Sequence, residues 1–207
     1  PLIISRKGTE RIVRAAFQMA RRRKGAPEDG VKRVTCTTKS NVVEAYAFFE
    51  EGFREVAKEY PDIQIEHYYT DALTVLMVQK PWHFDVIVTE NMFGDILSDL
   101  GAGTIGSLGL APSAEVGDKY GLFQSIHGSA PDIAGKGIVN PVAAILSGGM
   151  MFDWLGTKFN DPQAAEVGRK IEKATEAVLN KGQVKTPDLG GKNTTLQMTE
   201  AIIKELK

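Results

Sequence analysis

The chain has 207 residues, of which 43% are apolar and 25% charged, and its formal net charge is −1. This composition is ordinary for a globular protein and offers no general attraction to nucleic acid, so we expect no nucleic-acid partner. The longest apolar runs are too short to cross a bilayer and no signal peptide opens the sequence, so we expect no membrane partner. Cys36 is the single cysteine, which rules out an intrachain disulfide and favours a reducing, cytoplasmic location.

The first half of the chain alternates between two kinds of hydrophobic pattern. Apolar residues at helical spacing alternate with short β-rich runs, and Gly and Pro mark the ends. In chain order we expect a helix over 9–24, a loop over 25–30, a strand over 31–38, a helix over 40–60, a strand over 63–69, a helix over 71–79, a strand over 84–89 and a helix over 95–100. Alternation of this kind predicts an α/β protein with much parallel strand pairing.

The composition changes over residues 101–112, which contain four glycines in twelve residues and end at Pro112. We place a domain boundary here, dividing the chain into 1–105 and 106–207. Beyond it we expect a strand over 122–126, a Gly-rich loop over 127–140, a buried helix over 141–155, an amphipathic helix over 162–180 with Gly182 as its C-cap, a turn over 186–191 and a final helix over 194–206.

Two aspartates follow the predicted strand over 84–89. Asp95 and Asp99 are four residues apart, so a helix places both carboxylates on one face, where they repel each other. A divalent cation would relieve that repulsion, and oxygen ligands suit Mg²⁺ or Mn²⁺. The alternative is a solvated acidic helix face. The position after a buried strand favours a ligand site, because α/β proteins bind ligands at the carboxyl ends of strands.

Charged residues also follow the two earlier strands. Lys39 comes just after the strand over 31–38, where partial desolvation would suit it to proton transfer. Asp71 follows the strand over 63–69 in the same way. The alternatives are a solvated surface lysine and a helix N-cap. Three strands that end in charged groups form a more specific signal than any one position.

The loop over 127–140 could approach a nucleotide. Gly128, Gly135 and Gly137 allow the backbone close to a ligand, and Asp132 could accept a hydrogen bond from a ribose hydroxyl. The alternative is a plain surface loop. No G-x-G-x-x-G follows a strand, so an ordinary Rossmann site is not indicated.

Four motifs resemble those of the β-decarboxylating dehydrogenases: N-M-F-G-D-I-L-S-D, G-S-L-G-L-A-P-S-A, H-G-S-A-P-D-I-A-G-K-G-I-V-N-P and P-D-L-G-G. That family holds isopropylmalate, homoisocitrate, isocitrate and tartrate/D-malate dehydrogenases. The resemblance implies an α/β, isopropylmalate dehydrogenase-like two-domain fold whose N-terminal part is missing. Residues 1–105 would form most of a central dimerisation and metal-binding domain, and residues 106–207 the C-terminal half of the nucleotide-binding domain.

The resemblance also implies site residues. Asp95 and Asp99 resemble the Mg²⁺ or Mn²⁺ ligands, Asp71 looks like the third metal carboxylate, and Lys39 looks like the catalytic proton-relay lysine. In the family the last two reach the active site of the dimer partner, which implies a homodimer with shared active sites. The residues that resemble the cofactor loop are His127, Gly128, Ser129, Ala130, Asp132 and Asn140.

The expected activity is metal- and NAD-dependent oxidative decarboxylation of a malate-type 2-hydroxy acid. NAD is favoured because NADP-preferring relatives place Lys and Tyr where this chain has Asp132 and Ile133. T-K-S-N at 38–41 is similar to tartrate/D-malate enzymes, whereas H-Y-Y at 67–69 is nearer to isopropylmalate enzymes, so both substrates stay open, with isocitrate and homoisocitrate behind them. Gln124 stands where Glu is common. The alternative function is a non-catalytic subunit or interaction module that keeps the fold.

The missing upstream segment would bring the arginines that hold the substrate carboxylates and a catalytic tyrosine. The resemblance therefore implies that these residues alone are inactive.

Overall fold

A computed structural model describes residues 3–207. The chain divides into two compact units, Pro1–Thr104 and Ile105–Lys207, and each is described by itself. Within the described part of the chain, no helix combines the length and apolar character needed to cross a membrane.

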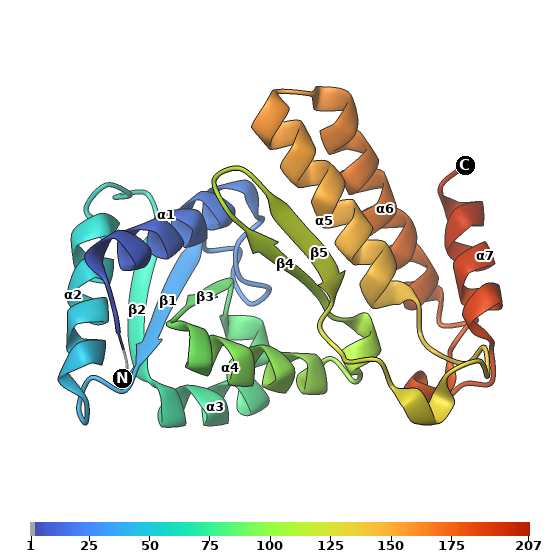
Figure 1. Ribbon diagram of the computed structural model, residues 1–207, viewed down its shortest axis with the longest axis horizontal. Coiled ribbons are helices and arrows are strands. Elements are labelled where there is room, and N and C mark those ends of the chain that lie inside the picture. The colour runs from blue at the N-terminus through green and yellow to red at the C-terminus, as the bar shows by residue number, and fades with distance from the viewer. Residues whose placement is uncertain (1–2) are drawn as a thin grey trace. The chain divides into compact units, whose positions relative to one another are not determined.

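The first unit is built on a three-stranded parallel sheet (Figure 1). Its strands are β1 (Arg33–Thr38), β2 (Gln64–Tyr69) and β3 (Val86–Val88), in the order β2-β1-β3. All six residues of β1 are buried, because it is the central strand. β1 and β2 pair in register from Arg33 opposite Gln64 to Thr38 opposite Tyr69, so the two strands end side by side.

Two helix pairs complete the first unit. Helices α1 (Arg6–Arg22) and α2 (Glu44–Ala57) contribute most of the core that packs on the sheet, where Phe17 stacks on Phe53 and on Tyr60. Helices α3 (Thr70–Gln79) and α4 (Asn91–Thr104) follow β2 and β3 and lie against each other below the sheet in Figure 1. The short 3₁₀ helix η1 (Pro81–His83) links α3 to β3.

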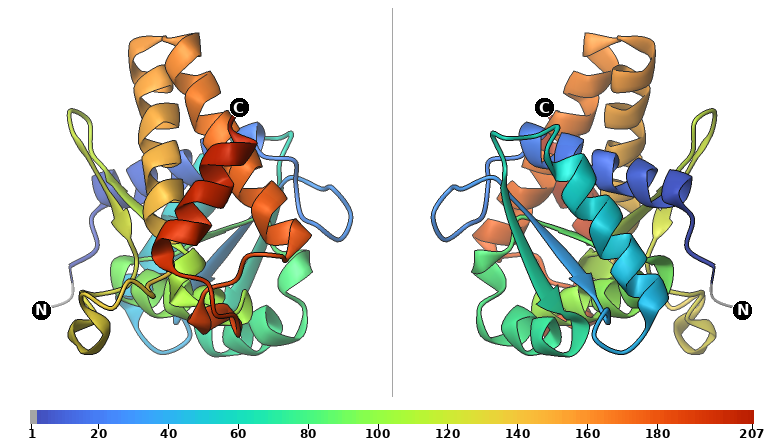
Figure 2. Two further views of the ribbon diagram at one scale, coloured as in Figure 1. Left: turned by 90° about the vertical axis from the view of Figure 1, so that its right-hand side faces the viewer. Right: turned by 90° about the vertical axis from the view of Figure 1, so that its left-hand side faces the viewer.

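The second unit combines an antiparallel hairpin with three helices. Strands β4 (Pro112–Val116) and β5 (Gly121–Ser125) pair with each other and pack on α5 (Val142–Phe159). Both views of Figure 2 show α5 and α6 (Pro162–Lys181) as a long adjacent pair, and α7 (Thr195–Glu205) packs on α6. Three 3₁₀ helices lie in the loops: η2 (Leu108–Leu110), η3 (Pro131–Ile133) and η4 (Pro187–Leu189).

Glycines allow the close approach of α5 and α6. A Cβ on Gly156 would lie 2.5 Å from the backbone nitrogen of Ala165, and one on Gly168 would lie 2.7 Å from the carbonyl oxygen of Gly149. These distances are shorter than real Cβ contacts, so a larger residue would force the helices apart. The apolar core of this unit centres on Val142, Met198 and neighbouring residues of α6 and α7.

The α/β class is confirmed, and the predicted elements are present with shifted ends. α2 begins at Glu44 rather than 40. α4 begins at Asn91 rather than 95, because both Glu90 carboxylate oxygens accept hydrogen bonds from the free backbone N–H groups of Met92 and Phe93. Strand β4 was not predicted. Helix α5 is mostly half-buried rather than fully buried, and Phe159 at its end is exposed.

Candidate functional site

Lys39 and Asp71 form an ion pair at the carboxyl edge of the sheet. Their strands are adjacent and parallel, so the residues that follow Thr38 and Tyr69 emerge side by side. The Nζ atom of Lys39 lies 2.7 Å from Oδ1 of Asp71, with side chains 28% and 69% exposed. The hydrogen bond from Lys39 holds the pKa of Asp71 below its ordinary value. The N-cap of α3 is Tyr69, so Asp71 lies in the first helical turn rather than at the cap.

Asp95 and Asp99 lie one turn apart on α4, and both are exposed. Across residues 3–207, neither carboxylate has a hydrogen bond or ion pair to another side chain. Two unpaired carboxylates on one helical face are a donor set that fits a hard divalent cation. The arrangement is compatible with the metal-ligand role that the sequence analysis expects of these two residues.

Asp71 does not join the pair within one chain. Among the residues that the structure describes, no three His, Cys, Asp or Glu side chains come together as a metal site. The first unit thus presents two separate groups: the Lys39–Asp71 ion pair and the Asp95/Asp99 pair.

The loop between β5 and α5 has an open, glycine-rich backbone. Ala130 adopts the left-handed conformation at φ 45°, and Gly135 and Gly137 have φ values of 75° and 65°. His127 Nδ1 donates to the carbonyl oxygen of Gly128 at 2.8 Å, which leaves Nε2 free to accept. Asp132 is exposed on η3. The residues predicted for the cofactor loop are mostly exposed, namely Gly128, Ser129, Ala130 and Asp132.

Asn140 differs from the rest of the loop because it is buried. Its Nδ2 donates to Asp188 Oδ2 at 2.9 Å, and its Oδ1 accepts from the backbone N–H of Val142 at 3.1 Å. Asp188 also accepts from the hydroxyl of Ser107 at 2.5 Å. Burial raises the pKa of Asp188, but the hydrogen bonds from Ser107 and Asn140 outweigh it and hold the pKa below its ordinary value.

The Asp188 cluster therefore anchors the loop at its base. Sequence reasoning assigned Asp188 no role, although the motif P-D-L-G-G that contains it was among those carrying the resemblance. The motif was the signal in the sequence that could have pointed to Asp188. What it did not reveal was the contact between residues 48 positions apart.

Three other residues that the sequence draws attention to have contacts that a structural role explains. Cys36 is fully buried in the central strand, and burial raises the pKa of its thiol, which argues against a nucleophile. Gln124 lies on β5, where its backbone carbonyl accepts from the Ser147 hydroxyl at 2.6 Å and its side chain is exposed. His67 lies in β2 and contacts Glu50 and Thr38.

The comparisons with known proteins identify the family of the chain. Residues 2–203 match the isocitrate/isopropylmalate dehydrogenase family. The chain is 50% identical over 206 residues to the 3-isopropylmalate/3-methylmalate dehydrogenase of Methanocaldococcus jannaschii, covering 99% of this chain and 59% of that protein. It is 47% identical to the isocitrate/homoisocitrate dehydrogenase of Thermus thermophilus, covering 99% and 58%.

A solved structure shows the same fold. The crystal structure of isocitrate dehydrogenase from Methylococcus capsulatus matches with a TM-score of 0.86 and 45% identity, covering 100% of this chain and 58% of that one. The chain thus spans somewhat more than half the length of these relatives. The family match covers nearly every residue, and the chain belongs to the isocitrate/isopropylmalate dehydrogenase family.

Proposed function

We propose that the full-length protein containing these residues, called the parent enzyme below, catalyses metal- and NAD-dependent oxidative decarboxylation of a malate-type 2-hydroxy acid. The observation that carries the proposal is the Lys39–Asp71 ion pair at the ends of adjacent parallel strands, in a chain of this family. Relatives are named for 3-isopropylmalate, 3-methylmalate, isocitrate and homoisocitrate. 3-Isopropylmalate or tartrate/D-malate is our first choice of substrate.

Asp95 and Asp99 would hold the metal together with Asp71. When bound, a divalent cation supplies Lewis acidity that polarises the substrate hydroxyl and its neighbouring carboxylate. Lys39 would take the hydroxyl proton, directly or through water, as hydride leaves the same carbon for NAD⁺. The β-keto acid that results loses CO₂. Lys39 would have to be in its neutral amine form to take this proton, because an ammonium has no lone pair to accept one. Its side chain is 28% exposed, so a substrate can reach the amine.

The cofactor would be NAD, bound along the loop that carries His127, Gly128, Ser129, Ala130, Asp132 and Asn140. An exposed Asp132 carboxylate can accept a hydrogen bond from a free ribose 2′-hydroxyl, whereas it would repel a 2′-phosphate. The Asp188–Asn140 contact supports this proposal because it fixes the end of the loop against α5.

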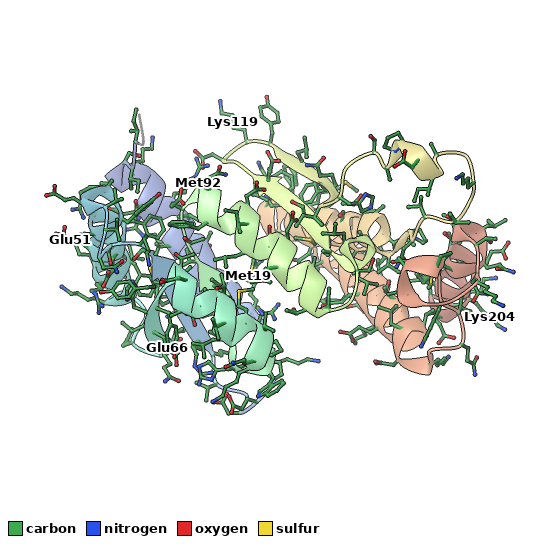
Figure 3. The ribbon with its side chains drawn as sticks, turned by 90° about the horizontal axis from the view of Figure 1, so that it is seen from below. Met19, Glu51, Glu66, Met92, Lys119 and Lys204 are labelled. Atoms are coloured by element: carbon green, nitrogen blue, oxygen red, sulfur yellow. The ribbon has the colours of Figure 1, made fainter. Side chains whose placement is uncertain are left out.

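The parent enzyme would be a homodimer with shared active sites. Asp71 lies apart from Asp95 and Asp99 in the described chain, so a second copy would have to bring it to them. Apolar side chains that are more than half exposed lie on α3 and α4: Val75, Val78, Met92 and Ile96. Met92 is labelled on α4 in Figure 3. Exposed apolar surface of this kind is typical of a protein–protein interface.

The test is a substrate panel on the parent enzyme. Malate derivatives are supplied with NAD⁺ and Mn²⁺, and NADH formation is followed by absorbance. Turnover that is lost in the Asp95→Asn variant is the expected result, and the preferred derivative identifies the substrate. No turnover on any member of the panel would overturn the proposal and leave the non-catalytic subunit as the better description.

A further inference from the structure

A cluster of charged and hydroxyl side chains surrounds the base of Lys39. We propose that Glu50, acting through Ser40 and His67, is a positioning group that holds Lys39 in its catalytic place. The inference rests on the proposed function for the role of Lys39, but the contacts that carry it do not. None of these residues contacts the ammonium of Lys39 directly, so they act on the turn that bears it.

The residues on both sides of Lys39 are tied to the cluster. Ser40 donates from its hydroxyl to Oε2 of Glu50 at 2.8 Å. Thr38, fully buried at the end of β1, has its hydroxyl 2.9 Å from Nε2 of His67. Nε2 of His67 also lies 3.2 Å from the same Glu50 oxygen. The His67–Glu50 contact is an ion pair when His67 is protonated.

Glu50 is itself held in one orientation. Its second oxygen, Oε1, accepts from Nη2 of Arg54 at 2.7 Å and from Nε at 3.1 Å. The Glu50 side chain is 18% exposed, so these bonds form with limited competition from water. Burial raises the pKa of Glu50, but hydrogen bonds from Arg54 and Ser40 and the nearby His67 outweigh it and hold the pKa below its ordinary value.

The turn that carries Lys39 has few other constraints. The carbonyl oxygen of Lys39 accepts from the backbone N–H groups of Val42 and Val43 at 3.0 and 3.2 Å. Val43 is the N-cap of α2 and offers no side-chain cap. The Ser40–Glu50 hydrogen bond is therefore the side-chain bond that ties this turn to α2.

Lys39 is thus held at both ends. Asp71 binds its Nζ atom from β2's side of the sheet, and the Glu50 cluster fixes its backbone. A displacement of about 1 Å in a catalytic group can cost on the order of 100-fold in rate, so fixing the turn matters for kcat.

The experiment compares three variants of the parent enzyme with a matched control. Ser40→Ala removes only the hydroxyl, Ser40→Thr restores it, and Glu50→Gln keeps the shape of the side chain but not its charge. The control is Glu51→Gln, an equal charge change at the next residue of α2, which is exposed and is labelled in Figure 3. Two readouts are taken: kcat and KM with the preferred substrate, and hydrogen exchange of the Val42 and Val43 amides.

Ser40→Ala and Glu50→Gln are expected to lower kcat about tenfold while KM for NAD⁺ changes less than about twofold, because positioning affects the chemical step. Exchange of the Val42 and Val43 amides should rise about threefold or more. Ser40→Thr and Glu51→Gln should match the parent enzyme in both readouts.

Unchanged exchange in both Ser40→Ala and Glu50→Gln would overturn the inference, and so would faster exchange with an unchanged kcat. A Ser40→Thr variant as impaired as Ser40→Ala would also overturn it, because the hydroxyl would not be the active feature. If the unmodified parent enzyme turns over no 2-hydroxy acid, the proposed function fails instead, and the exchange rates alone still decide whether Glu50 holds the turn.

Discussion

The Lys39–Asp71 ion pair is too exposed to contribute much to stability. The carboxylate of Asp71 is 69% exposed, and exposed ion pairs contribute between about 0 and 1 kcal/mol to folding. The buried Thr38 and half-buried His67 beside it are held by hydrogen bonds of their own.

The metal proposal predicts a direct loss of affinity in one variant. Asp95→Asn should weaken Mn²⁺ binding by the parent enzyme about tenfold or more, about 1.4 kcal/mol, because the carboxylate charge facing the cation is lost. Calorimetric titration measures the affinity. Glu51→Gln, which removes an equal charge from α2, should bind Mn²⁺ as the parent does. Equal affinity in Asp95→Asn and the parent would remove Asp95 from the site.

The cofactor proposal predicts a change in preference. Asp132→Lys combined with Ile133→Tyr should move the ratio of kcat/KM for NAD⁺ and NADP⁺ toward NADP⁺, because a repulsion is removed and a cation is added. Steady-state kinetics with both cofactors provide the ratio. The single variant Ile133→Tyr separates the effect of charge from that of shape. A ratio that stays constant in the double variant would mean that Asp132 does not face the ribose.

At the scale of elements, the close packing of α5 on α6 requires glycine at the positions where the two helices touch. Gly156→Ala would place a Cβ 2.5 Å from the backbone nitrogen of Ala165, so the variant should lower the free energy of unfolding by about 1–3 kcal/mol through overpacking. Gly148→Ala on the same helix meets nothing within 4 Å, and should raise it by about 0.5–1 kcal/mol through helix propensity. Urea unfolding of both variants measures whether the free energy of unfolding falls or rises in each.

Equal effects in the two variants would contradict the close approach of α5 and α6 at Gly156. A stabilising Gly156→Ala would do so most directly, because the gain in propensity could then be realised without a clash. Both variants make the same Gly→Ala change on the same helix. The difference between their free energies of unfolding therefore reports the packing at Gly156.

The sequence predicts the elements whose signals are local, and misses those set by contacts. The end of α6 at Gly182 was predicted because Gly adopts the required φ of 62°. The start of α4 was misplaced because Glu90 is an unusual residue to accept the first helical N–H groups. Strand β4 has a proline at its first position and little alternation, and exists through its pairing with β5.

The candidate site shows the same division. The strand pattern predicted that Lys39 and Asp71 each follow a strand, and the parallel pairing of β1 and β2 brings those two strand ends together. The role of Glu50 was not predicted, since its contacts with Ser40 and His67 join residues far apart in the chain and depend on the rotamers of side chains. Asp188 was overlooked for the same reason.

At the scale of the whole molecule, the proposed site needs groups that the described residues do not bring together. The described residues bring no three metal-binding side chains together, and the chain spans about three-fifths of its curated relatives. We therefore expect residues 1–207 alone to show no dehydrogenase activity in an assay that detects the parent enzyme. Activity of the 207-residue protein with Mn²⁺ and NAD⁺ would mean that one chain holds every essential group.

Shared active sites predict complementation between two inactive variants of the parent enzyme. If Lys39 and Asp71 of one subunit serve the Asp95/Asp99 pair of the other, a heterodimer of Lys39→Ala and Asp95→Asn subunits contains one site with both changes and one site with neither. Random exchange makes half of the dimers mixed, so activity should return to about a quarter of that of the parent. Subunit exchange is verified by mass spectrometry with one partner isotopically labelled. Continued inactivity after verified exchange would show that each subunit builds its site from its own residues, and the exposed apolar surface of α3 and α4 would then need a different explanation.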